Sequence, residues 1–278
     1  MPLFIINAKS GREKKDKIAQ VAEAKGYKVV FTEYAGHAEV LARESTEDIV
    51  VAVGGDGTVN EVARGIIGTN KTLGIIPCGS GDGLARHLGI PHNLDRAIKR
   101  IECGESKPID VAEVNGRLFL SVCGVGFDAT VSKEFALSGE RGLASYIKQG
   151  LKTLKVYAPD NYTVEIDGKN IQTNALFITV GNSDQWGNGA KIVPLAECCD
   201  GILDISVVEK FGVWSLPWLA IRLMTGTLHK SSKVHCYKGK RIRIVRELEG
   251  VVHADGDWFM GPKELDIKIL PSALKILL

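Results

Sequence analysis

Short, uninterrupted apolar runs alternate with longer amphipathic stretches over the first part of the chain. The apolar runs predict strands at residues 3–6, 28–32 and 72–76, and a buried strand at residues 49–53. The stretches between them carry apolar residues at helical spacing, at residues 12–25, 37–44 and 58–67. Strands that alternate with helices predict a three-layer α/β domain, in which helices cover both faces of a parallel sheet.

From about residue 107 the pattern changes to short strands joined by turn signals. Asn115-Gly116 and Asp167-Gly168 are type I′ hairpin signals, and Lys238-Gly239 is expected to join a third hairpin over residues 234–245. More strands are expected at residues 174–180, 202–208, 250–253 and 265–270, and two helices at 142–154 and 216–224.

These patterns predict an α/β domain at residues 1–108 and an antiparallel β-sandwich-like domain at residues 109–278. The C-terminal tail of the second domain can return to the first. The cleft between two such domains is the usual place for an active site.

The stretch that carries most chemical information is Gly54-Gly55-Asp56-Gly57-Thr58-Val59-Asn60-Glu61. It follows a buried strand, and the Thr58–Glu61 spacing is typical of a capping box that starts a helix. A strand, a glycine loop and a helix in succession form an anion site. The loop lacks the lysine of a Walker A motif and the third glycine of a dinucleotide fingerprint. Asp56 therefore serves a metal, a hydroxyl or a ribose, or it belongs only to a tight turn.

Two other loops follow predicted strands in the same way, at residues 7–11 and 79–83. Ligands of parallel sheets bind beyond the carboxyl ends of the strands. We therefore expect the three loops to form one phosphate site.

The overall composition limits the classes of function. The net charge of +2 does not suggest a nucleic-acid partner, and no apolar run is long enough to span a membrane. The six cysteines form no Cys-x-x-Cys pair and no secretory signal is visible, which favours reduced thiols in a cytosolic protein.

Taken together, the motifs resemble those of the diacylglycerol kinase catalytic family, which includes bacterial soluble lipid kinases and the sphingosine and ceramide kinases. The resemblance covers essentially the whole chain, through residues 7–11, 54–62, 77–86, 124–129, 200–204 and 255–257. The Gly-Gly-Asp-Gly-Thr element also occurs in NAD kinases, so the ordered set is what is specific.

The resemblance implies a role for each matching residue. ATP would be held by Asn7, Ala8, Lys9, Ser10, Gly11, Thr32, Gly54, Gly55, Asp56, Gly57, Thr58, Val59, Asn60 and Ser80. A structural magnesium ion would be bound by the Asp200 side chain and the main-chain oxygens of Glu197 and Ile202.

The catalytic residues implied are Asp257, as the base for the lipid hydroxyl, and Asp56, which would orient the metal and the nucleophile. The chain departs from the family at two positions. Asp82 stands where the family usually has Asn, and Asp257 where it has Glu. The histidines His87, His229 and His253 show no ligand spacing and are expected to be structural or solvent-facing.

We therefore expect a cytoplasmic, peripherally membrane-associated kinase that uses ATP and Mg²⁺. Its acceptor would be a lipid such as diacylglycerol, giving phosphatidic acid. A sphingoid-base or ceramide kinase is the first alternative; an NAD kinase and a non-catalytic nucleotide- or lipid-binding protein are others. A homodimer is left open.

A lipid substrate has to be reached at a membrane surface. Residues 211–224 carry Trp214 and Trp218 four positions apart, with Phe211, Leu219 and Ile221 nearby and Arg222 and Lys230 on the flanks. Such a segment either contacts the bilayer or lines a lipid tunnel, or it is a core helix of the β domain.

Overall fold

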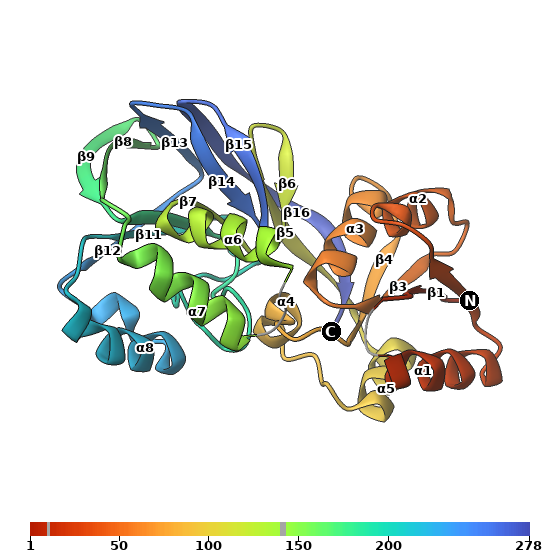
Figure 1. The fold of residues 1–278 in the computed structure, drawn as a ribbon. Helices are drawn as coiled ribbons and strands as arrows, with labels where there is room; N and C mark the ends of the chain where they lie inside the picture. Colours follow the sequence, from red (N-terminus) through yellow and green to blue (C-terminus); the bar gives the residue numbers. More distant parts are fainter. Residues whose placement is uncertain (10–11, 140–142) are drawn as a thin grey trace. The chain divides into compact units, whose positions relative to one another are not determined.

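The computed structural model describes residues 1–9, 12–139 and 143–278, and these form two compact units. The first unit comprises Met1–Asp110 together with Pro271–Leu278, and the second comprises Val111–Leu270 (Figure 1). No helix in the described part of the chain is both long and apolar enough to cross a bilayer.

The first unit is built on a parallel sheet. Its strands are β1 (Leu3–Asn7), β2 (Lys28–Thr32), β3 (Ile49–Gly54) and β4 (Thr72–Pro77), arranged in the order β2-β1-β3-β4. The end of β16 (Glu264–Leu277) adds a further strand, since Lys275 and Ile276 pair in parallel with Thr72 and Leu73. All four predicted strands are present. The apolar side chains of β1, β3 and β4 are buried in the core, whereas β2 lies at the edge of the sheet and is only partly buried, with Phe31 exposed.

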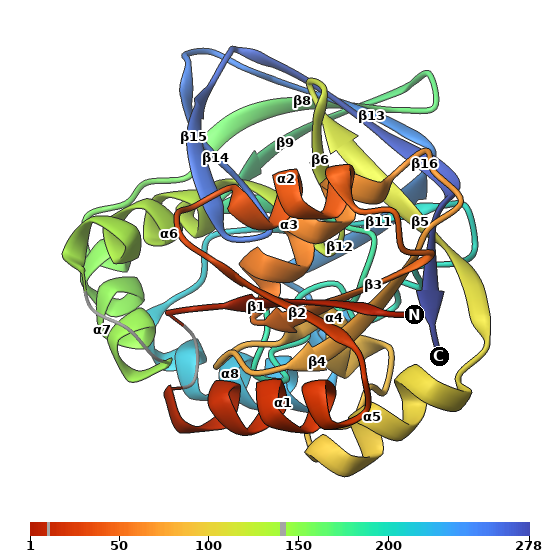
Figure 2. The same ribbon diagram turned by 90° about the vertical axis from the view of Figure 1, so that its right-hand side faces the viewer.

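Helices cover both faces of this sheet (Figure 2). They are α1 (Arg12–Ala24), α2 (His37–Glu44), α3 (Asp56–Ile66), α4 (Gly83–His87) and α5 (Leu94–Cys103). On one face Ile18 of α1 and Ile98 of α5 pack into the same core cluster as Phe4 and Val51 of the strands. On the other face α3 packs closely on α2. The predicted three-layer α/β architecture is confirmed.

The predicted capping box is wrong. Helix α3 begins at Asp56, two positions before Thr58. The Glu61 carboxylate instead accepts the backbone N–H groups of Gly36 and Ala38, at 2.9 and 3.2 Å, and so caps the neighbouring helix α2. Thr58 and Glu61 have the spacing of a capping box, but the Thr58 hydroxyl accepts a hydrogen bond from Asn7 and the Glu61 carboxylate binds the start of α2.

The second unit is a sandwich of two sheets. One is six-stranded and antiparallel, in the order β12-β11-β10-β7-β14-β15. These strands are Val234–Gly239, Leu203–Val208, Phe177–Gly181, Val122–Gly126, Gly250–Ala254 and Asp257–Gly261. The other sheet, called the mixed sheet here, contains β16 with β13 (Arg241–Arg246), β8 (Asp160–Ile166), β9 (Lys169–Ala175), β5 (Ser106–Val114) and β6 (Arg117–Phe119). One buried cluster contains side chains of both sheets, which confirms the predicted β-sandwich.

The described residues of this unit form three helices, one more than predicted. They are α6 (Phe127–Ser138), α7 (Leu143–Leu154) and α8 (Leu216–Thr225), with short 3₁₀ turns at Val213–Ser215 and Leu228–Lys230. Helix α6 was missed because it starts directly after a glycine-rich strand end.

Two of the three predicted hairpins form. Asn115-Gly116 and Asp167-Gly168 both have positive φ angles, as type I′ turns require, and they join β5 to β6 and β8 to β9. The predicted hairpin over residues 234–245 is wrong. Strand β12 pairs with β11, whereas β13 pairs with β8 and β16, so the chain passes from one sheet to the other there. Gly239 does not adopt the left-handed backbone of a tight turn.

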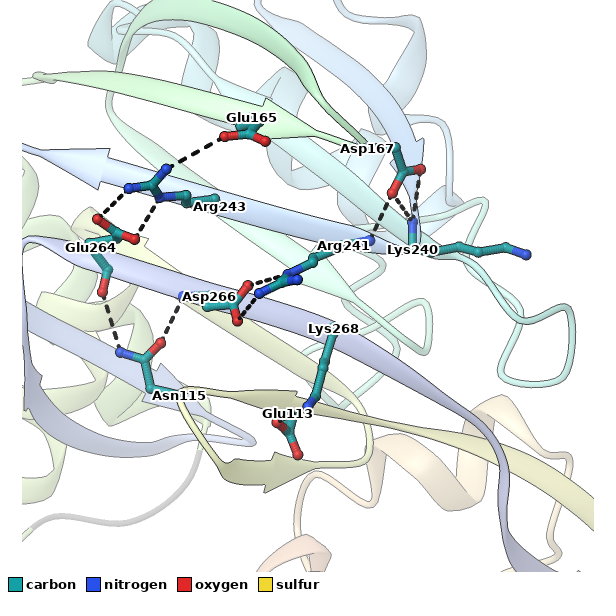
Figure 3. Close-up of polar contacts among 10 residues, drawn as sticks. All are labelled: Glu113, Asn115, Glu165, Asp167, Lys240, Arg241, Arg243, Glu264, Asp266 and Lys268. Atoms are coloured by element: carbon teal, nitrogen blue, oxygen red, sulfur yellow. Dashed lines mark hydrogen bonds and ion pairs between the residues drawn. The ribbon is translucent and has the colours of Figure 1, made fainter.

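The outer face of the mixed sheet carries interleaved opposite charges (Figure 3). Arg241 pairs with both oxygens of Asp266 at 2.9 Å, and Arg243 contacts Glu264 at 2.6 Å on the adjacent strand. Lys268 reaches Glu113 at 2.9 Å. Exposed pairs of this kind contribute little singly, on the order of 0 to 1 kcal/mol. Their alternation with buried Ile242 and Ile244 marks this face as the solvent face of the sandwich.

Gly65→Ala tests the close packing of α3 on α2. A Cβ atom at Gly65 would lie 2.5 Å from the carbonyl oxygen of Glu39 and 2.9 Å from the Cβ of Ala42. We expect a loss of about 1 to 3 kcal/mol in the free energy of unfolding, measured by urea denaturation.

Gly150→Ala is the matched control, because it also places alanine in a helix. Its Cβ would meet only Val131, at 4.0 Å. Higher helix propensity should make this variant equal to or more stable than the wild type, by up to about 1 kcal/mol. Equal destabilisation of both variants would show that the α2–α3 contact is not the cause.

Candidate functional site

The loops that follow β1 and β3 are tied together in the first unit. Asn7, the last residue of β1, donates from Nδ2 to the Thr58 hydroxyl at 2.9 Å. Its Oδ1 accepts the backbone N–H of Lys9 at 2.9 Å, which shapes the loop after β1. Asn7 and Thr58 therefore act on the structure of the loops, whatever ligand the loops bind.

The loops after β3 and β4 touch at two glycines. A Cβ atom on Gly79 would lie 2.6 Å from the Cα of Gly55, and a Cβ on Gly54 would lie 2.5 Å from the Thr58 hydroxyl oxygen. No larger residue fits at these positions without moving the backbone. Gly57 differs, since it is exposed and a Cβ there would meet nothing within 4 Å. Its lack of a side chain leaves room for a ligand to approach the start of α3.

The Asp56 carboxylate is directed at the beginning of α4. Its Oδ1 accepts the backbone N–H of Leu84 at 3.4 Å, and backbone N–H groups of Gly83 and Asp82 also favour its charge. Burial outweighs these donors and raises the pKa of Asp56 above its ordinary value. Asp56 thus connects the loop after β3 to the loop after β4.

Asp82 lies next to Asp56 and is buried. Its backbone is left-handed, with φ of 46°, and its Oδ1 accepts the N–H of Gly79 at 3.0 Å. Its Oδ2 lies 3.2 Å from His92 Nε2, without the alignment of a hydrogen bond. Burial, and then the charge of Asp56, raise the pKa of Asp82. Two partly desolvated carboxyls therefore lie close together where phosphate binding was predicted.

The remaining predicted nucleotide residues differ in their surroundings. The Thr32 hydroxyl accepts the N–H of Ala8 at 3.4 Å, and Ser80 is exposed. Val59 and Asn60 are buried in α3. Ser10 and Gly11 lie outside the described residues. Contact of these residues with ATP stays a prediction.

The hairpin turn between β14 and β15 is fixed by its first aspartate. Asp255 and Gly256 have φ angles of 50° and 87°, so the turn is of type I′. The Asp255 carboxylate accepts the backbone N–H groups of Leu120, Ser121 and Val122 at 2.6, 2.8 and 3.0 Å. Asp255 thus anchors the turn, while Gly256 and Asp257 are exposed.

Asp257 begins β15 and is exposed. It follows the anchored Asp255 by two residues, so its backbone extends from a fixed turn while its side chain is accessible. This combination suits a group that takes a proton from a substrate.

A buried polar network supports this hairpin. In β14, His253 lies with Nε2 3.2 Å from Asp128 Oδ2, which also accepts the Thr179 hydroxyl at 2.8 Å. Gly124 faces His253 in the sheet register, and a Cβ there would lie 2.1 Å from Asp128 Oδ2. Space for the Asp128 carboxylate explains why this position is glycine. His253 is therefore structural and not solvent-facing.

Sequence reasoning missed a second polar segment beside Asp255. Residues 182–185 follow β10 and all four side chains are buried. Asn182 donates from Nδ2 to the Leu120 carbonyl oxygen at 2.8 Å, and the backbone N–H groups of Asn182 and Ser183 donate to Ser121. The signal available was a polar run directly after the apolar run of a strand, which ordinarily indicates an exposed loop.

The residues predicted to hold magnesium precede β11. The Asp200 Oδ1 accepts the backbone N–H of Ile202 at 3.1 Å. Its Oδ2 lies 3.9 Å from Lys238 Nζ, which is also 3.1 Å from Oδ2 of the buried Asp204. The lysine already balances these carboxylates, and the described residues contain no group of three side chains suited to a metal ion. The predicted magnesium site uses a single carboxylate, Asp200, together with the main-chain oxygens of Glu197 and Ile202, so the lack of a three-side-chain group does not bear on it. The assignment stays a prediction.

Comparison with protein families matches both parts of the chain. Residues 2–114 match the diacylglycerol kinase catalytic domain, and residues 121–278 match the YegS C-terminal NAD kinase beta sandwich-like domain. The resemblance seen in the motifs is thereby confirmed.

Individual relatives are similar over nearly the full chain. The diacylglycerol kinase of Bacillus subtilis is 30% identical over 92% of this chain and 89% of its own length. A Salmonella arizonae protein named "Probable lipid kinase YegS" is 32% identical over 84% of this chain and 79% of its own length. A solved structure of a proposed diacylglycerol kinase from Bacillus anthracis superposes with a TM-score of 0.82, at 26% identity, over 99% of this chain and 94% of that one.

Asp82→Asn tests the repulsion between the two buried carboxyls. Asn keeps an oxygen for the Gly79 N–H and tolerates left-handed backbone, but it removes a charge. Folding raises the pKa of Asp82. The folded protein therefore loses stability as the pH rises from the pKa of the unfolded chain, near 3.8, through the higher pKa of the folded state. We expect the variant to be more stable than the wild type at pH 7 and to lose that advantage toward pH 4 in urea unfolding. The same stability difference at both pH values would contradict this account.

Proposed function

Because the chain belongs to the diacylglycerol kinase catalytic family of lipid kinases, we propose that it transfers the γ-phosphate of ATP to a lipid hydroxyl. Diacylglycerol is the proposed acceptor and phosphatidic acid the product. The match over both parts of the chain and the name of the Bacillus subtilis relative support this choice.

The observation that carries the proposal is the contact of the two glycine loops in the first unit. Close approach of Gly55 and Gly79 gathers backbone of two strand ends beside the exposed Gly57 at the start of α3. Backbone N–H groups and a helix N-terminus favour phosphate oxygens. Phosphoryl transfer depends mainly on such positioning and on charge stabilisation.

Magnesium, when bound with the nucleotide, would offset the charge of the phosphates. Asp56 and Asp82 would hold it, since both are carboxyls whose ionisation burial disfavours and a nearby cation would favour. Two carboxylates and phosphate oxygens fit the usual magnesium shell, which seldom needs an all-protein cage.

In the proposed reaction the acceptor hydroxyl oxygen forms a bond to the γ-phosphorus as the bond to the β,γ-bridging oxygen breaks. Asp257 takes the hydroxyl proton, and ADP leaves with the electron pair of the broken bond. Asp255 is a positioning residue, because it fixes the turn from which Asp257 extends.

The proposal is tested by γ-phosphate transfer from radiolabelled ATP with Mg²⁺. Diacylglycerol, monoacylglycerol, sphingosine and ceramide in mixed micelles, and NAD⁺ in solution, are offered in parallel. We expect label in diacylglycerol. Label in sphingosine or ceramide would establish the first alternative, and label in NADP⁺ would make the chain an NAD kinase. Binding of ATP without label in any acceptor would identify a non-catalytic protein.

Asp257→Asn tests the proposed proton acceptor while leaving Asp255, which fixes the turn, unchanged. The amide cannot accept the hydroxyl proton, so we expect kcat to fall about 10²- to 10⁴-fold with unchanged ATP affinity and unfolding free energy. Asp257→Glu, which restores the residue usual in the family, should stay within about tenfold of the wild type.

Asp255→Asn is the companion variant. Replacing a charged acceptor of several N–H groups should lower the free energy of unfolding by about 2 kcal/mol and lower activity with it.

Wild-type turnover by Asp257→Asn would contradict the assignment of Asp257 as the base.

A further inference from the structure

Helix α8 presents an apolar face to solvent. Trp214, which precedes it, is 97% exposed, Trp218 is 63% exposed, and Ile221 and Met224 are also exposed. Their spacing places them on one side of a helix. The opposite side packs into the unit, where Leu219 is buried and Leu223 is partly buried. The segment thus has one face packed as in a core helix and another that is exposed and available for contact with a bilayer.

Helix α7 also exposes apolar side chains and rests on the same core as α8. Its Ile147 and Leu151, four residues apart, are about half exposed. Leu154 at its end packs into the cluster that holds Leu219 and Leu223, so α7 and α8 rest on one core over the six-stranded sheet (Figure 1). We call the outward side chains Ile147, Leu151, Trp214, Trp218, Ile221 and Met224 the α7–α8 face.

The two sequence segments that carry this face contain no acidic residue. No Asp or Glu occurs between residues 141 and 159 or between residues 210 and 246. Exposed lysines in or beside these segments include Lys152, Lys155, Lys210 and Lys230. No carboxylate partner for these four is found in the part of the chain that the structure describes. By contrast, the arginines of the mixed sheet are matched by acids on adjacent strands (Figure 3).

We propose that the α7–α8 face docks on an anionic lipid surface, with its tryptophans in the headgroup region and its lysines against the headgroup charges. Tryptophan and basic residues favour this interface, and an amphipathic helix lies in its plane without spanning the bilayer. The inference deepens the proposed function, because a lipid kinase has to reach an acceptor that resides in a membrane.

A second copy of the chain is a poorer occupant. In a two-fold contact the same patch meets itself, so the unpaired lysines of one copy would approach those of the other. Like charges without acidic partners oppose such a contact. A membrane that contains anionic lipids instead supplies the opposite charge.

Vesicle flotation tests the proposal without any catalytic step. Wild-type protein is mixed with vesicles of phosphatidylcholine alone or with phosphatidylglycerol added. We expect binding to the anionic vesicles that weakens as salt rises. Trp214→Ser/Trp218→Ser should bind these vesicles at least about tenfold more weakly than the wild type. Leu248→Ser removes another exposed apolar side chain, in the segment between β13 and β14, and should bind as the wild type does.

The lysines are tested by Lys152→Gln/Lys155→Gln. Each lysine near an anionic surface contributes roughly a fivefold change in binding, so the double variant should lose about 25-fold on anionic vesicles and little on neutral ones. Lys169→Gln/Lys263→Gln is the control, since Lys169 begins β9 and Lys263 directly precedes β16, both outside α7 and α8.

Failure of docking and failure of the proposed function can be told apart. With a dispersed short-chain diacylglycerol, Trp214→Ser/Trp218→Ser should turn over like the wild type, and only its activity on vesicles should fall. Absence of turnover in every variant, with vesicle binding intact, would reject the kinase and leave the docking face. Equal vesicle binding by wild type and tryptophan variant would overturn the proposal. So would a dimer of the wild type in gel filtration that the tryptophan variant abolishes.

Discussion

The contact between Gly55 and Gly79 is the constraint on which the first unit's loops depend. A Cβ atom at Gly79 would lie 2.6 Å from the Gly55 Cα, and one at Gly55 would lie 3.1 Å from the Gly79 Cα, so the loops after β3 and β4 fold as a closely fitted pair. Asp56 can reach the start of α4 only because the loops meet. A parallel sheet brings its strand ends to one edge; the glycines decide how tightly those ends are joined there.

Carboxylates bound to backbone N–H groups recur as the means of fixing turns. Glu61 holds the start of α2, and Asp255 holds three successive N–H groups at the start of β7. Ionised acceptors make stronger hydrogen bonds than neutral ones, so one side chain can order a whole segment. The two aspartates of Asp255-Gly256-Asp257 therefore have different roles. The first aspartate is committed to structure, which leaves the exposed third residue available for chemistry.

The sequence predicted most of the fold because its strongest patterns are local. Continuous apolar runs identified the parallel strands, and Asn115-Gly116 formed a turn because both residues accept positive φ. The hairpin predicted at Lys238-Gly239 was wrong because apolar and polar residues keep alternating there while the chain passes from one sheet to the other. The converging loops of the site were foreseen from topology. The partners of Thr58, Glu61 and the buried residues 182–185 were not, since they belong to elements distant in sequence.

A net charge of +2 conceals two different surfaces of the second unit. On the mixed sheet, Arg241 and Arg243 face acids on adjacent strands, so that surface balances its own charge and needs only water. Over the six-stranded sheet, Lys152 and Lys155 lie beside exposed apolar side chains with no acid in that stretch of sequence. Exposed tryptophan and unbalanced lysine are each unfavourable in water alone, the first for its apolar area and the second for mutual repulsion. Both penalties are relieved by one kind of environment, a surface that is apolar inside and anionic at its boundary.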